Sequence, residues 1–306
     1  MAPPGVWHTL AFALLAPAEA FTLHVGRTAP SPAYPLSMVA TEPASSSVAV
    51  AERYVATNRF RVKQGREAAF EKRWADRKSR LGLLDGFRFF CMMRRCEREG
   101  YEDDINYVSC TVWETADAFN AWKSGDAFKE AHGGGTVGGI ASMLIATAMN
   151  TKGKPKAAMW EGTLPVSIVP EAAPSAGWRE VVADGESTLP GECYIAMNRF
   201  SVKQGHEGEF EQRFATREST LKEFDGFKGF LLLRRDGKDP DGFTHSTFSV
   251  WKDEASFNKW KNAEKPKPPA STGDAGGPSN RNNIFERPPV PVFYEGILTL
   301  ESAKGI

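Results

Sequence analysis

The stretch YVATNRFRVKQGREAAFEKRWADRKSRLGLLDGFRFFCMMRR, Tyr54–Arg95, occurs twice in this chain. Its second copy, YIAMNRFSVKQGHEGEFEQRFATRESTLKEFDGFKGFLLLRR, spans Tyr194–Arg235 and aligns with it without a gap. About half of the aligned positions are identical, which indicates a tandem duplication. The match resumes further on, with TVWETADAFNAWK (Thr111–Lys123) against SVWKDEASFNKWK (Ser249–Lys261). The chain therefore carries one structural module twice.

The pattern within each copy predicts strand, helix, strand, strand, helix, strand. In the first copy, alternating residues predict a strand over 54–62, the turn Asp85-Gly86 precedes a strand over 87–94, and further strands are expected over 107–113 and 157–164. One predicted helix carries Phe70, Trp74 and Leu81 on a single stripe. The other begins at Thr115, a suitable N-cap, and carries Trp122. This βαββαβ order is typical of the ferredoxin-like α+β fold.

A four-stranded sheet with helices on one side leaves its other face bare, and a bare apolar face must be covered. We therefore expect two tandem ferredoxin-like domains, packed sheet to sheet as a pseudo-dimeric α+β barrel within one chain. The expected boundaries are a targeting presequence over 1–50, a first domain over 51–166, a linker over 167–191 and a second domain over 192–306.

The composition is that of an ordinary globular protein. The formal net charge is zero and 25% of residues are charged, so the balance of charges gives no reason to expect nucleic acid or a membrane as a partner. The four cysteines, Cys91, Cys96, Cys110 and Cys193, show no zinc-binding spacing. We expect them to be small buried apolar residues.

The first fifty residues differ from the rest. Leu10–Ala16 is an apolar run too short to span a membrane, and Ala18-Glu19-Ala20 resembles a small-residue cleavage site. Phe21 follows, and then a stretch rich in Ser, Thr, Ala and Pro and poor in acids. This arrangement resembles the bipartite presequence that directs proteins to secondary plastids. Plain secretion, or a disordered tail, is the alternative.

Three residues of the first copy are candidates for a role in binding or catalysis, although each also has a structural explanation. Asn58 interrupts an otherwise apolar strand face, where it either caps a turn or donates a hydrogen bond in a pocket. Trp122 is typical of a helix core. His132 precedes glycines at a helix end, where a histidine commonly stabilises the helix dipole. The apolar segment Thr136–Asn150 either walls a slot for an apolar ligand or forms an extra core helix.

Taken together, these residues resemble the IsdG-type heme-degrading monooxygenases of the antibiotic biosynthesis monooxygenase superfamily, whose members form dimeric α+β barrels. The resemblance covers most of residues 54–165 and, more weakly, 194–300. The matching motifs are Asn58-Arg59, Gly86-Phe87, Thr111-Val112-Trp113, Ala118-Phe119-Asn120-Ala121-Trp122 and Trp122-(x9)-His132.

The resemblance implies that heme is both substrate and cofactor. It implies that His132 is the axial ligand of the heme iron, that Asn58 hydrogen-bonds an oxygen species on the distal side, and that Trp122 bends the porphyrin from planarity. These are levers by which a protein controls heme chemistry. The implied reaction opens the porphyrin with O2 and releases iron. Its electrons come from an external donor such as ferredoxin or a reductase, because the sequence shows no flavin or nicotinamide fingerprint.

The second copy departs from this pattern. Asn198 and Trp260 repeat the first copy, but Ala270 stands near the position of the histidine, and Lys265–Pro291 is typical of a flexible loop. We therefore expect one heme per chain, with the second copy as a structural partner. Two other functions stay open: a heme-binding or heme-carrier protein without turnover, and a cofactor-free monooxygenase that acts on a small aromatic.

Overall fold

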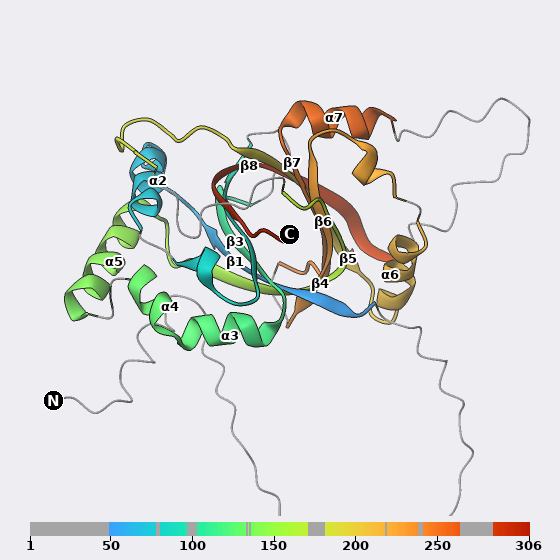
Figure 1. Ribbon diagram of the computed structural model, residues 1–306, viewed down its shortest axis with the longest axis horizontal. Coiled ribbons are helices and arrows are strands. Elements are labelled where there is room, and N and C mark those ends of the chain that lie inside the picture. Colours follow the sequence, from blue (N-terminus) through green and yellow to red (C-terminus); the bar gives the residue numbers. More distant parts are fainter. Residues whose placement is uncertain are drawn as a thin grey trace, which may run out of the picture.

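The computed structural model describes residues 49–77, 80–96, 103–132, 134, 136–170, 181–217, 219–237, 241–263 and 284–306 (Figure 1). The presequence expected over 1–50 lies outside the described residues except for its last two. The middle of the linker and Ala270 also lie outside them. The plastid presequence and the domain boundaries therefore stay predictions.

Eight strands form a closed barrel in which every neighbouring pair is antiparallel. The first copy supplies β1 (Ala51–Phe60), β2 (Phe87–Arg95), β3 (Tyr107–Trp113) and β4 (Lys156–Ser167), and the second supplies β5 (Cys193–Val202), β6 (Phe227–Asp236), β7 (His245–Trp251) and β8 (Phe285–Glu301). Their order around the barrel is β1-β3-β2-β8-β5-β7-β6-β4. Each copy thus contributes the four-stranded sheet predicted for a ferredoxin-like module.

The two halves join edge to edge. Strand β2 pairs with β8, with Phe90 opposite Leu300, and β4 pairs with β6, with Gly162 opposite Leu233. The predicted pseudo-dimeric α+β barrel is confirmed, and backbone hydrogen bonds close it. Closure removes the unpaired strand edges that two separate sheets would expose.

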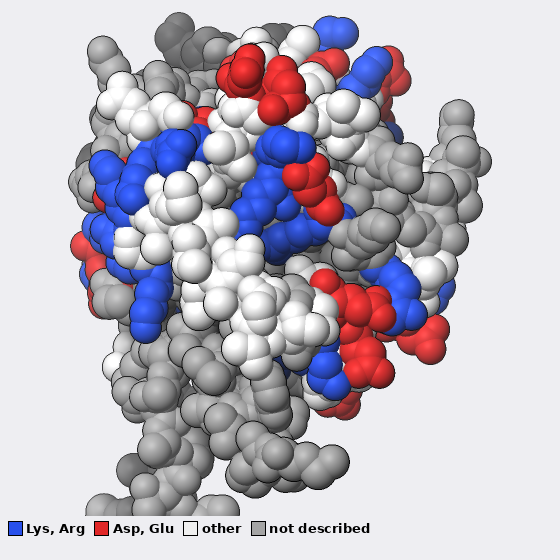
Figure 2. Space-filling view, turned by 90° about the vertical axis from the view of Figure 1, so that its left-hand side faces the viewer, with Lys and Arg blue, Asp and Glu red and all other residues white. Residues whose placement is uncertain are grey.

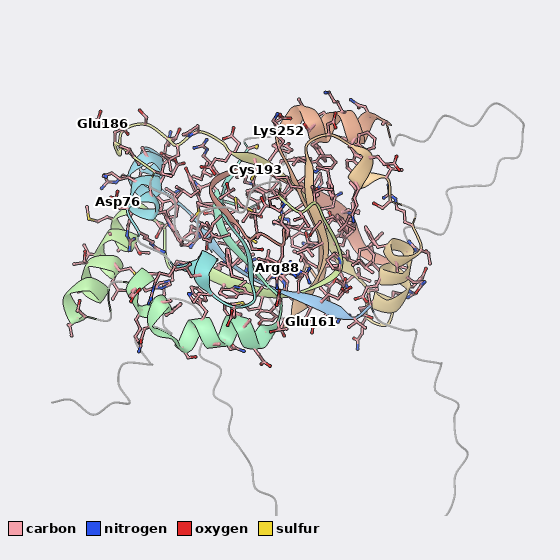
Figure 3. The ribbon with its side chains drawn as sticks, viewed as in Figure 1. Asp76, Arg88, Glu161, Glu186, Cys193 and Lys252 are labelled. Carbon is pink, nitrogen blue, oxygen red and sulfur yellow. The ribbon has the colours of Figure 1, made fainter. Side chains whose placement is uncertain are left out.

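Alternate strand residues face the barrel interior and the surrounding helices. In β1, Val55 is fully buried in the interior cluster, whereas Ala56 and Phe60 join the cluster beneath the helices. This confirms the predicted face of the first strand. The interior also holds three of the four free cysteines, Cys91, Cys110 and Cys193, the last of which is labelled in Figure 3.

Helices cover the outside of each sheet (Figure 1). They are α2 (Glu67–Ala75), α3 (Ala116–Ser124), α4 (Asp126–Ala131) and α5 (Val137–Asn150) on the first copy, and α6 (Glu207–Ala215) and α7 (Glu254–Ala263) on the second, with short 3-10 turns η1 (Leu81–Leu83) and η2 (Leu221–Glu223). Thr115 caps α3 as predicted, because its hydroxyl accepts a 3.1 Å hydrogen bond from the backbone N–H of Ala118. Thr136 caps α5 in the same way, accepting from Gly139 at 3.1 Å.

Two predictions of local structure were wrong. The helix expected to carry Phe70, Trp74 and Leu81 ends at Ala75, and Leu81 reaches the same cluster from η1. Residues 285–291, expected as flexible loop, are the first part of β8. Here β8 pairs with β5 alone, since β2 pairs with it only from Tyr294 onward. A strand with one neighbour tolerates prolines, which cannot donate a backbone hydrogen bond.

Matching polar networks tie each sheet to the other copy. The guanidinium of Arg94 binds the fully buried carboxylate of Glu71 at 2.8 Å and reaches Glu295 of β8 at 2.6 Å. In the second copy, Arg234 binds Glu211 at 3.0 Å and reaches Glu161 of β4 at 2.7 Å; Glu161 is labelled in Figure 3. The repeated charges therefore bridge both junctions between the halves.

Candidate functional site

Helices α2, α4 and α5 surround one outer face of the first copy, at the left of Figure 1. Beneath them lies an aromatic cluster that includes Phe60, Trp74 and Trp122. Figure 2 views this side of the molecule directly and shows Lys and Arg side chains in the middle of it, with Asp and Glu side chains and uncharged side chains beside them. The structure brings Trp122 and His132 into contact here and places Asn58 on the adjoining strand β1.

His132 follows α4 directly, as its C-cap. Its Nδ1 lies 2.7 Å from the carbonyl oxygen of Phe128. A carbonyl oxygen only accepts, so Nδ1 carries the hydrogen and Nε2 is the unprotonated nitrogen of a neutral ring. The imidazole also stacks on the Phe128 ring, with 4.0 Å between centroids. Among the described residues nothing hydrogen-bonds Nε2, so this lone pair is available to a ligand.

The protonation state of His132 follows from its surroundings. Burial lowers its pKa from 6.5 to about 4, and the positive charge of Arg77 acts in the same direction, while the hydrogen bond to Phe128 opposes them. The ring is therefore neutral at pH 7. A neutral imidazole held at Nδ1 by a backbone carbonyl, with Nε2 free, is the form in which histidine binds a metal ion.

Trp122 contacts both Trp113 of the core and His132 of the candidate site. Its indole stacks on Trp113, with 5.4 Å between centroids, and Trp260 stacks on Trp251 at the same distance in the second copy. This stacking is thus a feature of the fold, as the core interpretation expected. The indole also lies 6.3 Å from the His132 ring, between centroids, so it forms part of the wall beside the imidazole.

Asn58 lies in the middle of β1, opposite Ser109 of β3 and Ala157 of β4. Its Oδ1 is buried and has no hydrogen-bond partner among the described residues, so the turn-cap interpretation is wrong. Leaving a buried amide oxygen unpaired costs about 1–3 kcal/mol. Among the described residues no contact joins Asn58 to Trp122 or His132, although all three belong to this side of the first copy.

Arg77 is a site residue that the sequence did not reveal. Its guanidinium carbon lies 3.6 Å from the centre of the Trp74 ring, a cation–π contact. Burial lowers its pKa to about 9, and the charge of Arg73 adds to the effect, but the side chain is still a cation at pH 7. No carboxylate among the described residues pairs with it. A desolvated, unpaired guanidinium is a binding site for an anionic group.

Arg73 has a different role. It donates to the Met143 carbonyl oxygen at 2.9 Å and to the Thr147 hydroxyl at 3.0 Å, which fixes α5 against α2. The only sequence signal for these two arginines is that Arg73 and Arg77 recur in the second copy as Arg213 and Arg217. The assembled site offers one nitrogen ligand for a metal, an aromatic wall and one cation for an acidic group.

The second copy lacks this arrangement. Asn198 holds the position of Asn58 in the register but is exposed. Its backbone N–H bonds the Thr247 hydroxyl at 2.9 Å. No segment of the second copy corresponds to α5 in the sequence. The asymmetry between the copies therefore extends beyond the missing histidine.

The sequence profile of the family described as antibiotic biosynthesis monooxygenase matches residues 53–134 and 193–267, together more than half of the 306-residue chain. The chain belongs to this family. Each matched segment falls on one copy, and the first ends two residues beyond His132. The family assignment explains the repeated ferredoxin-like module and supports an oxidoreductase of the monooxygenase type.

The chain is also similar to two individual proteins. A protein of Staphylococcus haemolyticus named heme oxygenase (staphylobilin-producing) is 37% identical over 81 residues, which cover 26% of this chain and 72% of the relative. A solved structure from Fusobacterium nucleatum, named as a monooxygenase, superposes with a TM-score of 0.53 at 12% identity, covering 84% of this chain and 97% of the other. At that identity the second likeness is one of fold alone.

Proposed function

We propose that this protein is a heme-degrading monooxygenase with a single heme site, in the first copy, among β1, α2, α4 and α5. One observation carries the proposal: the neutral imidazole of His132 is held at Nδ1, has no hydrogen bond at Nε2 from any described residue, and lies beside the indole of Trp122. The heme oxygenase of S. haemolyticus named above supports the same reaction class.

The available side chains fit the chemistry of heme. His132 Nε2 would be the ligand for iron, and the guanidinium of Arg77, which no carboxylate among the described residues pairs with, would suit a propionate carboxylate. The Oδ1 of Asn58, which has no partner among the described residues, suits a hydrogen bond donated by a small molecule, and the NH2 of the same amide is a donor. These groups are a nitrogen ligand, a cation and an amide, which match a planar apolar molecule with iron at its centre and carboxylates at its edge.

Bound heme supplies the iron that activates O2 and the porphyrin that is opened, with electrons from an external donor such as ferredoxin or a reductase. His132 would hold the iron while remaining uncharged. Trp122, which stacks on Trp113, would resist displacement by the macrocycle. Asn58 would donate from its amide without releasing a proton.

The test is a hemin titration of the 306-residue chain, followed by absorption in the Soret region. We expect saturation at one equivalent of hemin. In His132→Ala the Soret maximum should shift, because the histidine ligand is gone. Reductant and oxygen are then added, and loss of the Soret band with formation of a bilin and release of iron is expected. A stable Soret band would instead indicate a heme carrier. Saturation at two equivalents, or an unchanged spectrum in His132→Ala, would overturn the site.

A further inference from the structure

Helix α5 presents an uncharged, apolar surface to solvent. Among its large side chains, Val137 is 68% exposed, Ile145 61%, Met149 53% and Leu144 38%. The whole sequence of the helix, VGGIASMLIATAMN, contains no charged residue. Isolated exposed apolar residues are common, but several on one helix mark a surface that binds something.

Hydrogen bonds from Arg73 and Lys63 hold α5 on the protein. Arg73 binds the Met143 carbonyl oxygen and the Thr147 hydroxyl, as described above. At the C-terminal end of the helix, Lys63 Nζ binds the carbonyl oxygens of Ala148 and Met149 at 2.8 and 3.1 Å. The outward residues make no comparable contribution to the fold, so their apolar character needs another explanation.

Basic residues border the C-terminal end of this surface. The segment after α5 is joined to the segment after β1, because Lys63 N–H donates to the Asn150 carbonyl oxygen and Lys152 N–H to that of Arg61, both within 2.8 Å. Four exposed cations lie on or next to these joined segments: Arg66, whose N–H bonds the Lys63 carbonyl oxygen, Lys152, Lys154, and Lys156, which is opposite Arg59 in the sheet. On this side of the molecule, Figure 2 shows uncharged side chains with Lys and Arg beside them, and Asp and Glu nearby. We call α5 together with these four cations the α5 surface.

We propose that the α5 surface docks on an anionic lipid bilayer, lying on it and not crossing it. Apolar side chains enter the headgroup region while adjacent cations meet the lipid charges, and each such cation contributes about 1 kcal/mol near the surface. No helix in the described parts of the chain is long and apolar enough to cross a membrane. The net charge of the whole chain is zero, but it is a sum over all residues and does not show the local excess of positive charge at the α5 surface.

Three acids among the described residues near this face, Asp126, Glu130 and Asp104, are each paired with a cation outside the α5 surface. Asp126 and Glu130 of α4 lie near the other end of the site, and each is already paired, with Lys129 at 2.8 Å and with Arg80 at 2.9 Å. Next to the basic border, Asp104 lies 3.5 Å from Arg61, outside the four cations named above.

A second copy of the chain fits the α5 surface less well than a lipid bilayer does. A stable dimer needs about 20–30 residues from each partner, and α5 has 14 residues, part of which face the protein. Self-association through α5 would also leave its basic border without opposite charge. A bilayer supplies both an apolar layer and negative charge over an area of any extent.

The docking inference goes beyond the proposed function and does not depend on it. Its consequence for substrate supply does rest on the proposed function: α5 lies beside the heme site, so docking would bring that site to a bilayer. Heme is an apolar molecule with carboxylates that partitions into bilayers, and it would enter from there.

The test is co-sedimentation of the 306-residue chain, without heme, with vesicles of phosphatidylcholine alone or with about one third phosphatidylglycerol. We expect binding to the anionic vesicles that falls as salt is raised. Ile145→Glu, and the double variant Lys152→Glu/Lys154→Glu, should each lower the partition coefficient at least about tenfold. The matched controls are Val169→Glu, at a residue 63% exposed elsewhere, and Lys259→Glu on α7; both should bind like wild type.

Circular dichroism establishes that each variant folds. Equal vesicle binding by wild type and both α5 variants would overturn the proposal, and so would a concentration-dependent dimer that Ile145→Glu abolishes in the absence of any vesicle binding. A separate arm follows the Soret change as heme passes from vesicles to the protein. Vesicle binding without heme uptake would remove the proposed function and leave the docking inference standing.

Discussion

Arg59 of the first copy forms its ion pair with Asp241 of the second, with 2.5 Å between Nη1 and Oδ2. The mirror relationship holds as well, because Arg199 of the second copy binds Asp103 of the first at 2.9 Å. The arginine of each Asn-Arg pair therefore reaches across to the other half. Arg59 thus links the two copies, while the residue before it, Asn58, belongs to the candidate site.

Removing Asp241 should weaken the barrel. Its carboxylate also binds Arg235 at 2.9 Å and the Phe243 N–H at 3.0 Å. Asp241→Ala leaves half-buried guanidinium groups without their anion, so we expect the free energy of unfolding to fall by about 2 kcal/mol, measured by guanidinium chloride denaturation. Glu209→Ala, at an exposed carboxylate that binds Arg213 within α6, is the control and should leave the midpoint unchanged. Equal midpoints in both variants would contradict a structural role for the ion pair between the copies.

The barrel interior can be tested at Gly296 of β8. A Cβ there would lie 2.3 Å from the Cys193 Sγ and 2.7 Å from the Cys91 Sγ. Gly296→Ala should therefore destabilise the protein by about 2 kcal/mol through overpacking. Gly191→Ala is the matched control, because its nearest new contact is at 3.6 Å. If both alanines leave thermal unfolding unchanged, the two halves do not pack as tightly as described.

The pKa of His132 has a consequence for acid stability. The ordinary value is 6.5 and the folded value about 4, so between these pH values the unfolded chain binds a proton that the folded chain does not. The unfolding free energy therefore keeps the full contribution of the neutral, buried ring above pH 6.5, and this contribution is lost as pH falls through 4. The unfolding free energy of His132→Gln should therefore fall less between pH 7 and pH 4 than that of wild type. Parallel pH curves would show that the ring is not desolvated.

Arg77 should contribute to heme affinity through its charge. Arg77→Leu removes a desolvated cation, and we expect heme affinity to fall about tenfold to a hundredfold. Arg217→Leu, at the equivalent position of the second copy, should leave affinity unchanged. The decisive comparison uses heme dimethyl ester, which has no free carboxylate: wild type and Arg77→Leu should bind it equally. A defect that persists with the ester would mean that Arg77 acts by packing alone.

Asn58 should separate stability from function. Asn58→Ala removes a buried unpaired oxygen, so the free energy of unfolding should stay the same or rise by about 1 kcal/mol. Heme binding should persist, while loss of the Soret band under reductant and oxygen should slow at least about tenfold. Asn198→Ala, at the exposed counterpart, should change neither quantity. A clear loss of stability in Asn58→Ala would indicate that its amide serves the fold.

The repeat was enough to predict the order of strands and helices along each copy, the ferredoxin-like module and the pseudo-dimeric barrel. Periodicity could not distinguish a helix from a helix followed by a turn, as at Leu81, because it records only which side chains share a core. It also missed the strand over 285–291, because the prolines there suggested a loop and only the pairing with β5 shows that one strand edge is free.

The sequence by itself determined the family, the duplication and the special residues Asn58, Trp122 and His132, because these depend on residue identity and spacing along the chain. Within the part of the chain that the structure describes, tertiary structure decided that Nε2 of His132 has no hydrogen bond, that Arg77 has no carboxylate partner and the Asn58 oxygen no hydrogen-bond partner, and that the apolar side of α5 faces outward. Those properties depend on burial and on neighbours distant in the chain. Desolvation and hydrogen-bond partners are fixed only when the two copies close into one barrel and the helices settle on it.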